Sequence, residues 1–482
     1  MFPSKMSLKK ATLINSAAKY YNVICAFIVN VILSRKLTPS EYGVVAVATV
    51  FITFFSLFSD LGFGVAYIQN RTLDRDDRDN LFTFLVYVGV VLLVLFTAFS
   101  YAIAWFYKDS VYIRVCQLLG VNLFFTAVNV IPNSELLKQQ RFKTVGITQA
   151  ISSTLSSVCA VIFANLGFSY YSIVLQSLIF TLVPGIVFIS ITKTRFLFKV
   201  HFESVKKVLG FSVGQIVFNF INYFSRNLDN LLIGKFFGNT ALGYYDKAYK
   251  TSTYPVSNLS SIIGSSIQPV MSKYQNDKEL VYDKFKKSFL FLIVIGAYLS
   301  ITLSLAARET ILVLYGFQWE NSIISFSFLA RSLFAQMSLN ITGAFYQVLN
   351  NTKLLAFAGG VTAIIIVGGI SVGLFIGSIE AVAICYFIAQ CINFIAILMI
   401  MSKRLFQRNM KDVVQELVKV LAVSTVTYLI SKMAFSYIIF DKLTVTLIMK
   451  MSVIGLIYFV LLYVTHLEKY VLKIIFPGYR RQ

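Results

Sequence analysis

The residues best suited to chemistry are polar side chains that recur at helical spacing inside the apolar segment 208–234. They follow one another at steps of four, three, four and four, and they are Gln215, Asn219, Asn222, Arg226 and Asn230. This spacing places them on one face of an α-helix. Because lipid cannot satisfy amide or guanidinium groups, the stripe predicts a functional path inside the protein rather than a lipid-facing surface.

A second stripe with the same spacing lies in the first apolar segment. It consists of Asn15, Lys19, Asn22, Ala26 and Asn30, and adding 200 to each number gives the positions of the first stripe. Lys19 corresponds to Asn219 in the other copy. Arg226 corresponds to Ala26, so positive charge is distributed between the copies rather than duplicated. Two such stripes indicate a duplicated protein with a water-filled path between its halves.

The repeat continues beyond the stripes. Residues 33–48 align without gaps on residues 233–248, and later the offset drifts by ten, so that Gly167 matches Gly377. We therefore expect two six-helix lobes and an appended helix pair. These are residues 1–207 (spans 1–6), 208–405 (spans 7–12) and 406–482 (spans 13–14 and a cytoplasmic tail). Because each lobe has six spans, an even number, both lobes begin on the same side of the membrane. They are therefore parallel repeats about an axis normal to the bilayer.

The elements that carry the stripes are membrane-spanning helices. Of 482 residues, 57% are hydrophobic and 13% charged, about half the charged fraction of a soluble domain. Apolar stretches near 20 residues recur from end to end, which predicts an all-α polytopic membrane protein with about 14 transmembrane helices. The expected spans are 11–33, 42–68, 81–106, 112–137, 145–166, 169–192, 208–234, 242–270, 286–307, 321–349, 354–377, 379–402, 413–437 and 443–466.

The net charge of +22 is explained by topology. With the N-terminus inside, roughly 28 Lys and Arg lie in cytoplasmic segments and roughly 6 outside, so both termini are expected in the cytoplasm. No soluble domain carries a basic patch, so nucleic acid is not an expected partner, whereas anionic membrane lipids are. The five cysteines form no CxxC pair, the two histidines are isolated, and no GxxxxGK[ST] loop occurs. We expect no metal, no other cofactor and no direct use of ATP.

Two segments resemble a known family. RKLTPSEYGVVAVATVFITFFSLFSDLGFGVAYIQ (35–69) and NYFSRNLDNLLIGKFFGNTALGYYDKAY (222–249) are similar to the Wzx-type, WzxC-like polysaccharide transporters of the multidrug/oligosaccharidyl-lipid/polysaccharide (MOP) exporter superfamily. The resemblance covers about the first 400 residues. It implies a flippase of the bacterial inner membrane, which moves undecaprenyl-diphosphate-linked oligosaccharide to the outer leaflet by alternating access. Polysaccharide assembly machinery is a further expected partner.

A diphosphate is bound best by cations that offer several hydrogen-bond donors. The candidates for that role are Lys19, Arg226, Lys247, Lys250 and Arg331. Arg226 has an alternative role as the ion-pair partner of Asp229, three residues away. Lys247 and Lys250 lie near a span end and have an alternative role as snorkelling residues. Lys450, in the appended pair, is expected to snorkel or to lie at the periphery.

Amide and tyrosine side chains are the candidates for contact with the glycan. They are Asn15, Asn22, Gln215, Asn219, Asn222, Asn230, Tyr245 and Tyr249. Interhelical hydrogen bonding is the alternative role of the amides. The carboxylates Asp60, Asp229 and Asp246 are candidates for coupling to H⁺ or Na⁺, although the membrane potential can also favour outward movement of an anionic diphosphate. A structural cap or a contact between the lobes is at least an equal alternative for Asp60.

Three other functions remain open. A cation-coupled multidrug exporter of the same superfamily would favour anionic or aromatic cavity residues, and the intramembrane charges here are mainly basic. A polysaccharide polymerase or ligase would need a long outer loop with catalytic residues. A membrane scaffold would not need the stripes. The longest outer connection, 308–320, predicts a short interfacial helix with Trp319 in the headgroup region.

Overall fold

The computed structural model describes residues 8–60, 62–70, 72–209, 212–260, 263–264, 267, 270–437 and 442–475. Over 8–16, 207–209, 212–226, 436–437 and 473–475 it describes the backbone alone. All regular secondary structure in these residues is helical, which confirms the predicted all-α class. The chain divides into two compact units, Met1–Gly243 and Tyr244–Gln482. The division into lobes at residues 207 and 405 stays a prediction.

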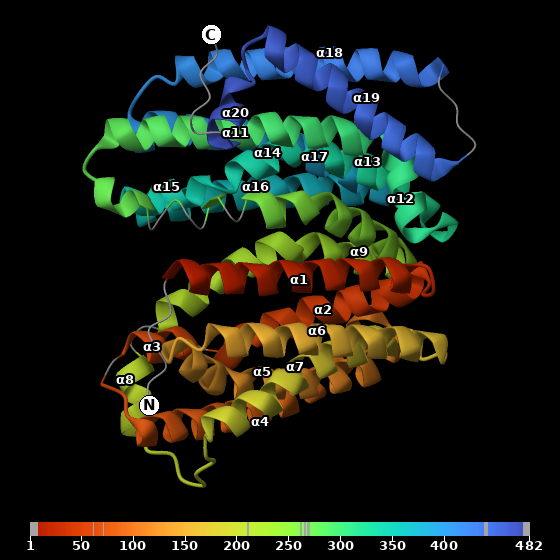
Figure 1. The fold of residues 1–482 in the computed structure, drawn as a ribbon. Coiled ribbons are helices and arrows are strands. Elements are labelled where there is room, and N and C mark those ends of the chain that lie inside the picture. The colour runs from red at the N-terminus through yellow and green to blue at the C-terminus, as the bar shows by residue number, and fades with distance from the viewer. Residues whose placement is uncertain are drawn as a thin grey trace. The chain divides into compact units, whose positions relative to one another are not determined.

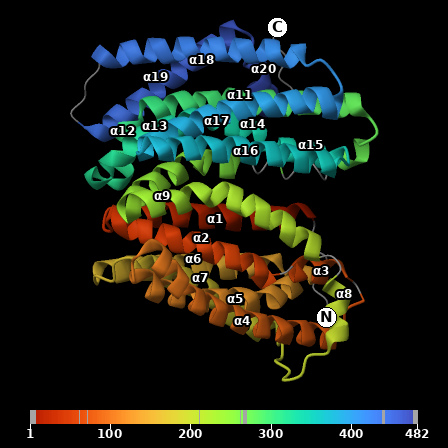
Figure 2. The same ribbon diagram turned by 180° about the vertical axis from the view of Figure 1, so that it is seen from behind.

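The first unit is a bundle of long helices with two short ones at one end (Figure 1). They are α1 (Leu8–Ser34), α2 (Pro39–Asp60), α3 (Phe63–Gln69), α4 (Arg75–Tyr107), α5 (Val111–Lys138), α6 (Phe142–Asn165), α7 (Tyr171–Thr192) and α8 (Phe202–Leu209). Helix α4 packs along α5, while α7 lies against both α5 and α6, as the reverse view also shows (Figure 2). Helix α1 packs on α6.

The second unit is organised around α11 (Lys278–Leu305), against which α13, α14, α18 and α19 pack. Its other elements are η1 (Val256–Ser260), η2 (Ser272–Tyr274), α12 (Ala307–Tyr315), η3 (Phe317–Ser322), α13 (Ile323–Arg331), α14 (Leu333–Leu339), α15 (Thr342–Val348), α16 (Thr352–Ile376), α17 (Ile379–Ile400), η4 (Met401–Phe406), α18 (Lys411–Tyr437), α19 (Leu443–Val464) and α20 (Lys469–Ile475). Phe285, Phe289 and Phe345 are fully buried in its core.

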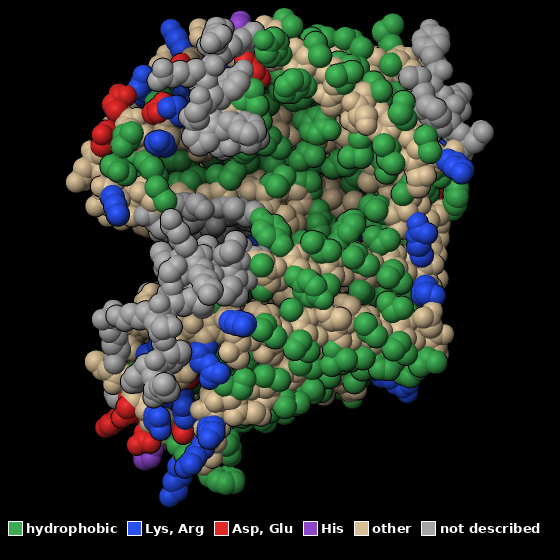
Figure 3. All heavy atoms as spheres, viewed as in Figure 1, with side chains coloured by type: hydrophobic (Ala, Val, Ile, Leu, Met, Phe, Trp, Pro, Cys, Tyr) green, Lys and Arg blue, Asp and Glu red, His purple; other side chains and the backbone are tan. Residues whose placement is uncertain are grey.

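Among the described residues, 11 helices are long and apolar enough to cross a membrane. A twelfth span results if Phe317–Arg331 and Leu333–Val348, which meet at an angle of 48°, count as one broken span. These twelve coincide with predicted spans 1–6 and 9–14. Large apolar side chains such as Trp105 and Phe375 are exposed on them, and Figure 3 shows hydrophobic side chains over much of the visible face of each unit. The protein is therefore a multi-pass membrane protein.

Predicted spans seven and eight both fall in α9 (Ser212–Pro255). This helix is less apolar than the twelve spans because it carries the polar stripe, and the count of 14 stays a prediction. Gly238 interrupts it with φ 83° and ψ 176°, a backbone conformation open essentially to glycine alone. The break lies inside the predicted connection 235–241, so α9 consists of two helical segments joined at Gly238.

The segment before α2 and the break in α9 have matched roles in the repeat. Thr38 and Glu41 form a capping box in which the Thr38 amide donates to the Glu41 carboxylate at 2.6 Å. The Glu41 amide in turn donates to the Thr38 hydroxyl at 3.3 Å, and Pro39 occupies the first helical position. Gly238 corresponds to Thr38 by the 200-residue offset. Both copies therefore begin a helix at the same place by different means.

Two glycines bring the repeat copies into direct contact. A Cβ atom on Gly43 would overlap the backbone carbonyl of Asn239. A Cβ atom on Gly243 would overlap the backbone carbonyl of Pro39. By the 200-residue offset, Pro39 corresponds to Asn239 and Gly43 corresponds to Gly243. The contact of Gly43 with Asn239 is therefore the counterpart of the contact of Gly243 with Pro39. Reciprocal contacts are what a two-fold relation produces, which supports the internal repeat at these positions.

The connection after α11 corrects one expectation. Helix α12 confirms a short helix between spans, but the placement of Trp319 in the headgroup region is wrong, since its side chain is fully buried. Gly316, at φ 95°, turns the chain back on itself before η3. The indole then packs edge-on against Tyr315, with ring centroids 6.3 Å apart. Burial of this large ring is a packing contact inside the second unit.

Lys450 also differs from expectation, because it neither snorkels nor lies at the periphery. Its Nζ lies 2.7 Å from a carboxylate oxygen of Glu309, and the two side chains are 17% and 8% exposed. It also donates to the carbonyl of Leu305 at 3.3 Å. The ion pair links α19, in the appended helix pair, to α12. A partly buried pair of this kind anchors the appended helices to the second unit.

Replacing Lys450 with methionine should lower the free energy of unfolding by about 3 kcal/mol, because it leaves the Glu309 carboxylate buried without its cation. Thermal unfolding of the detergent-solubilised protein measures the change. The double variant Lys450→Met, Glu309→Gln should recover most of the loss. Lys432→Met, at an exposed position in α18, is the matched control. Equal stability of Lys450→Met and the control would contradict the anchoring role.

Candidate functional site

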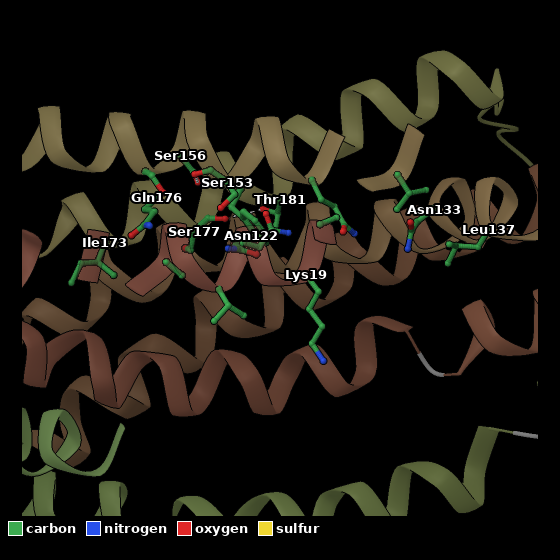
Figure 4. Close-up of a pocket in the computed structure, with 18 residues that line it drawn as sticks. Lys19, Asn122, Asn133, Leu137, Ser153, Ser156, Ile173, Gln176, Ser177 and Thr181 are labelled. Carbon is green, nitrogen blue, oxygen red and sulfur yellow. Dashed lines mark hydrogen bonds between the residues drawn. The ribbon is translucent and has the colours of Figure 1, made fainter. Parts of the chain in front are cut away.

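A cavity of about 760 Å³, lined by both polar and apolar side chains, lies in the first unit between α1, α5, α6 and α7. Its polar walls are Asn122 and Asn133 of α5, Gln149, Ser153, Ser156 and Ser157 of α6, and Gln176, Ser177 and Thr181 of α7. Figure 4 shows the labelled serine, glutamine and threonine side chains of α6 and α7 gathered close to Asn122. None of the described lining residues carries a carboxylate. The volume is typical of a site for a small organic ligand.

Each wall is one face of a helix. On α6, Gln149, Ser153 and Ser156 follow at steps of four and three. On α7 the lining residues 173, 176, 177, 180 and 181 follow the i, i+3, i+4, i+7, i+8 pattern of one broad helix face. The lining of α6 extends from Val145 to Ser157, twelve steps of about 1.5 Å that span about 18 Å. The cavity is therefore elongated along the helix axes.

A proline shapes the α7 wall. Pro184 lies inside α7 and has no N–H, so the carbonyl of Phe180, four residues earlier, lacks its intrahelical donor. The Ser152 hydroxyl of α6 donates to that carbonyl at 2.8 Å. The Asn129 amide of α5 donates to the carbonyl of Thr181 at 2.7 Å. These bonds fix α7 between α5 and α6 and satisfy the backbone groups that the proline would leave exposed.

Three residues of the stripe in the first apolar segment line this cavity from α1. They are Lys19, Asn22 and Ala26. Lys19 is exposed, and Figure 4 shows its side chain extending away from the cluster of serine and amide groups, so its charge lies at the rim. The side chain of Asn15 lies outside the described residues. The roles of Lys19 and Asn22 in substrate binding stay predictions.

Most of the stripe in α9 cannot be placed at the level of side chains. Those outside the described residues are Gln215, Asn219, Asn222 and Arg226. Asp229 and Asn230 are buried, and the backbone N–H of Asn230 donates to the Asp229 carboxylate at 2.9 Å. The Asn230 side-chain oxygen is buried with no hydrogen-bond partner in the described part of the chain. An ion pair between Arg226 and Asp229 stays a prediction.

The charged residues after the α9 break form a compact cluster in the second unit. Asp246 is buried, and its carboxylate pairs with Lys250 at 2.7 Å, one helical turn away. The Lys250 side chain is half exposed. Lys247 is buried, which rules out snorkelling for it in this structure. Its Nζ lies 4.8 Å from the ring centroids of both Tyr315 and Trp319.

Both distances are within the range of a cation–π contact. Burial raises the pKa of Tyr315 to about 12, although its hydrogen bond with Thr251 partly opposes the shift. Tyr315 is therefore neutral at physiological pH, and the attraction comes from its ring rather than from a phenolate. Lys247 thus joins α9 to α12 and η3, a packing role that the sequence pattern did not indicate.

The remaining basic and aromatic candidates make packing contacts with neighbouring aromatic rings. Tyr245 is fully buried and stacks on Tyr249 with ring centroids 6.2 Å apart, while Tyr249 meets Tyr386 edge-on at 5.9 Å. Arg331 ends α13 at the 48° bend, packs over the Phe328 ring at 4.4 Å, and has no partner for its buried Nε in the described residues. Roles for these residues in glycan or diphosphate binding stay predictions.

Asp60 acts as a helix cap in this structure. It is the last residue of α2, and its carboxylate accepts a hydrogen bond from the Gly64 amide of α3 at 3.0 Å. The left-handed Gly62 (φ 75°) turns the chain between the two helices. This geometry matches the structural alternative for Asp60. Its part in ion coupling stays a prediction.

The two roles of Asp60 make opposite predictions. If capping is its main role, Asp60→Asn should keep polysaccharide export near the wild-type level, because asparagine caps as well as aspartate, whereas Asp60→Ala should cost about 1 kcal/mol of stability. Export in a complemented deletion strain and thermal unfolding measure the two effects. Loss of export in Asp60→Asn, with normal protein level, would instead support ion coupling.

The cavity walls on α5, α6 and α7 were missed in the sequence, although a signal was present. Asn122, Thr126, Asn129 and Asn133 recur at steps of four, three and four, the same spacing as the predicted stripes. Four of the lining residues on α6 and α7 are serines, whose small side chains barely lower the apolar character of a span. The spacing of polar residues inside span four was therefore the clearest pointer to these three walls.

The structure is that of a polytopic helical membrane protein with a cavity in its first unit. The chain belongs to the polysaccharide biosynthesis protein family, whose model matches residues 32–324. It is 22% identical over 392 residues to the teichuronic acid biosynthesis protein TuaB of Bacillus subtilis, covering 79% of this chain and 81% of TuaB. It is also 22% identical to the succinoglycan biosynthesis transport protein ExoT of Rhizobium meliloti, covering 61% of this chain and 59% of ExoT.

Solved structures share this fold. The lipid II flippase MurJ in an inward closed conformation matches with a TM-score of 0.74 at 13% identity, covering 94% of this chain and 99% of MurJ. A multidrug resistance transporter of the MATE family, in its inward-facing conformation, matches with a TM-score of 0.62 at 14% identity, covering 79% and 95%. Both likenesses show that this chain shares the fold of these proteins.

Proposed function

We propose that this transporter flips undecaprenyl-diphosphate-linked oligosaccharide from the inner to the outer leaflet of the bacterial plasma membrane. Membership of the polysaccharide biosynthesis family supports a substrate destined for a surface polymer. The similarity to a succinoglycan transport protein points in the same direction. The movement proceeds by alternating access between two lobes, with both termini in the cytoplasm, where the excess of Lys and Arg lies.

The observation that carries the proposal is the lining of the cavity in the first unit. Its polar groups are amides and hydroxyls with one lysine at the rim, and no carboxylate lies among the described lining residues. Amides and hydroxyls complement the hydroxyl groups of a sugar. A cationic drug would be bound best by a carboxylate, and Phe180 is the one aromatic side chain among the described lining residues. The lining therefore favours a lipid-linked saccharide over the cation-coupled drug exporter.

The energy for the movement can come from the membrane potential. A potential supplies about 2.3 kcal/mol per charge per 100 mV, and an inside-negative potential favours outward movement of a doubly anionic diphosphate. Coupling to H⁺ or Na⁺ through Asp229 or Asp246 would add to this. No other cofactor is part of the proposal. Membrane lipids and polysaccharide assembly machinery are its remaining partners.

A deletion strain tests the function. The proposal predicts loss of surface polysaccharide and accumulation of lipid-linked oligosaccharide on the cytoplasmic leaflet, both reversed by a plasmid copy of the gene. Lipid extraction with chromatography measures the accumulated intermediate. Raised sensitivity to cationic drugs with normal polysaccharide would contradict the proposal and support the drug exporter.

A further inference from the structure

We propose that the cavity of the first unit binds uncharged sugar residues of the transported lipid, and that it excludes the diphosphate. The inference rests on the proposed function and deepens it, because it assigns one part of the substrate to one set of side chains. The part assigned is hydroxyl-bearing or acetamido-bearing sugar. The residues that carry the argument are Asn22, Asn133, Gln149, Ser153 and Gln176.

The charge of the lining separates the two parts of the substrate. A diphosphate carries negative charge that must be paired when it leaves water. Lys19 is the one cation among the described lining residues, and its side chain extends away from the serine and amide groups (Figure 4). The polar groups of the interior are thus neutral donors and acceptors, set among apolar side chains such as Val23 and Phe180. The interior suits a neutral, hydroxyl-rich group and disfavours an anion.

Two amide groups in the lining lack partners. The side-chain oxygens of Asn22 and Asn133 are buried, and neither accepts a hydrogen bond in the described part of the chain. A buried acceptor without a donor is unfavourable, so such groups are normally satisfied by water or a ligand. Both residues line the cavity, but their oxygens have almost no solvent-accessible surface in this orientation. A rotation of either side chain about its terminal torsion would present its amide to a sugar hydroxyl in the cavity.

Two glutamine side chains in the lining are available to bind a ligand. Gln149 on α6 and Gln176 on α7 line the cavity, and neither side chain forms a hydrogen bond within the described part of the chain. Each offers two donors and an acceptor. Because they hold no other element in place, their removal should change binding and leave the fold intact.

The shape of the cavity fits a saccharide. The α6 lining extends about 18 Å along the helix axis, so the cavity is elongated rather than round. Val23, Ile173 and Phe180 add apolar patches between the polar groups. A pyranose ring likewise presents C–H faces beside its hydroxyl edge. When a sugar lies inside the cavity, the adjoining diphosphate would lie outside the cavity, within reach of Lys19 at the rim.

Binding to protein in lipid nanodiscs tests the inference. The probes are undecaprenyl diphosphate alone and the same lipid carrying one hexose or one N-acetylhexosamine, with affinity measured by native mass spectrometry. Wild-type protein should bind at least one glycosylated probe about tenfold more tightly than the bare lipid. The double variant Gln149→Ala, Gln176→Ala should lose that preference and keep its affinity for the bare lipid. Two lost hydrogen bonds correspond to about a tenfold change.

Ser190→Ala is the matched control, since Ser190 lies on α7, is exposed, and bonds only to its own helix at Ile186. It should behave as wild type. A double variant that retains the preference would overturn the inference, because the sugar would then bind elsewhere. Wild-type protein that binds the bare lipid but prefers no glycosylated probe would also overturn it, leaving the cavity to water. Wild-type protein that binds none of the probes would instead contradict the proposed function.

Discussion

Replacing Gly43 with alanine should abolish polysaccharide export, and replacing Gly243 should do the same. An added Cβ at Gly43 would overlap the backbone carbonyl of Asn239, and backbone atoms cannot move aside as a flexible side chain can. The two helical segments would have to separate, at a cost of about 1–3 kcal/mol or more. Surface polysaccharide in a complemented deletion strain measures export, and immunoblotting of membranes measures insertion.

Gly368→Ala provides the control for these variants. Gly368 lies inside α16, and a Cβ there would meet no atom within 4 Å. This variant should export normally, since alanine is also the better helix former. Normal export by both Gly43→Ala and Gly243→Ala would show that the reciprocal contact is not required in any state of the transport cycle.

Neutralising Arg226 or Arg331 should reduce export at least tenfold while the protein still inserts. A hydrogen bond to a charged group contributes about 1.5–3 kcal/mol, and a diphosphate held by these cations would lose that contribution. Arg331 has a suitable position, since it lies at the bend between α13 and α14 with its buried Nε unpartnered in the described residues. Export by Arg226→Gln and Arg331→Gln, normalised to membrane protein level, measures the effect.

The control for the two arginine variants is Arg308→Gln, at an exposed position in α12. It changes the net charge equally and should leave export unchanged. Arg331→Lys keeps the charge but loses the planar pair of donors, so it should export at an intermediate level. Normal surface polysaccharide in both glutamine variants would remove the role of these arginines in holding a diphosphate.

The positions of the spans could be predicted from sequence because long apolar runs have few alternative explanations. The break at Gly238 was also within reach, since a glycine lies in a short polar connection between two apolar segments. The repeat was visible because matched glycines and polar residues inside apolar sequence are rare. Its reciprocal contact at Gly43 and Gly243 required the structure, because an offset in sequence gives no distance.

The surroundings of charged residues were much harder to predict. Lys247 and Lys450 both lie in apolar sequence, where snorkelling is the default expectation. The structure buries Lys247 against Tyr315 and Trp319, and pairs Lys450 with Glu309. In each case the partner is distant in sequence, so tertiary packing decides the outcome. Trp319 was misplaced for the same reason.

The cavity itself escaped prediction because three of its four walls are built from small or isolated polar residues. Ser153 and Ser177 hardly alter the hydropathy of α6 and α7, and their significance depends on the helix that each one faces. Asn22, in the predicted stripe, was found because amides in a lipid-spanning helix are conspicuous. The stripe thus identified one wall, and the structure supplied the other three.

The central claim is that this transporter moves a lipid-linked saccharide across the bilayer. The most direct measurement uses proteoliposomes that contain purified protein and undecaprenyl-diphosphate-linked saccharide, in which a lectin added outside reports the saccharide reaching the outer leaflet. We predict that exposure to lectin rises faster with the wild-type protein than with Gly43→Ala, and faster still under a membrane potential that favours the anion's movement towards the lectin. A rate equal to that of protein-free liposomes, with folded wild-type protein present, would contradict the claim.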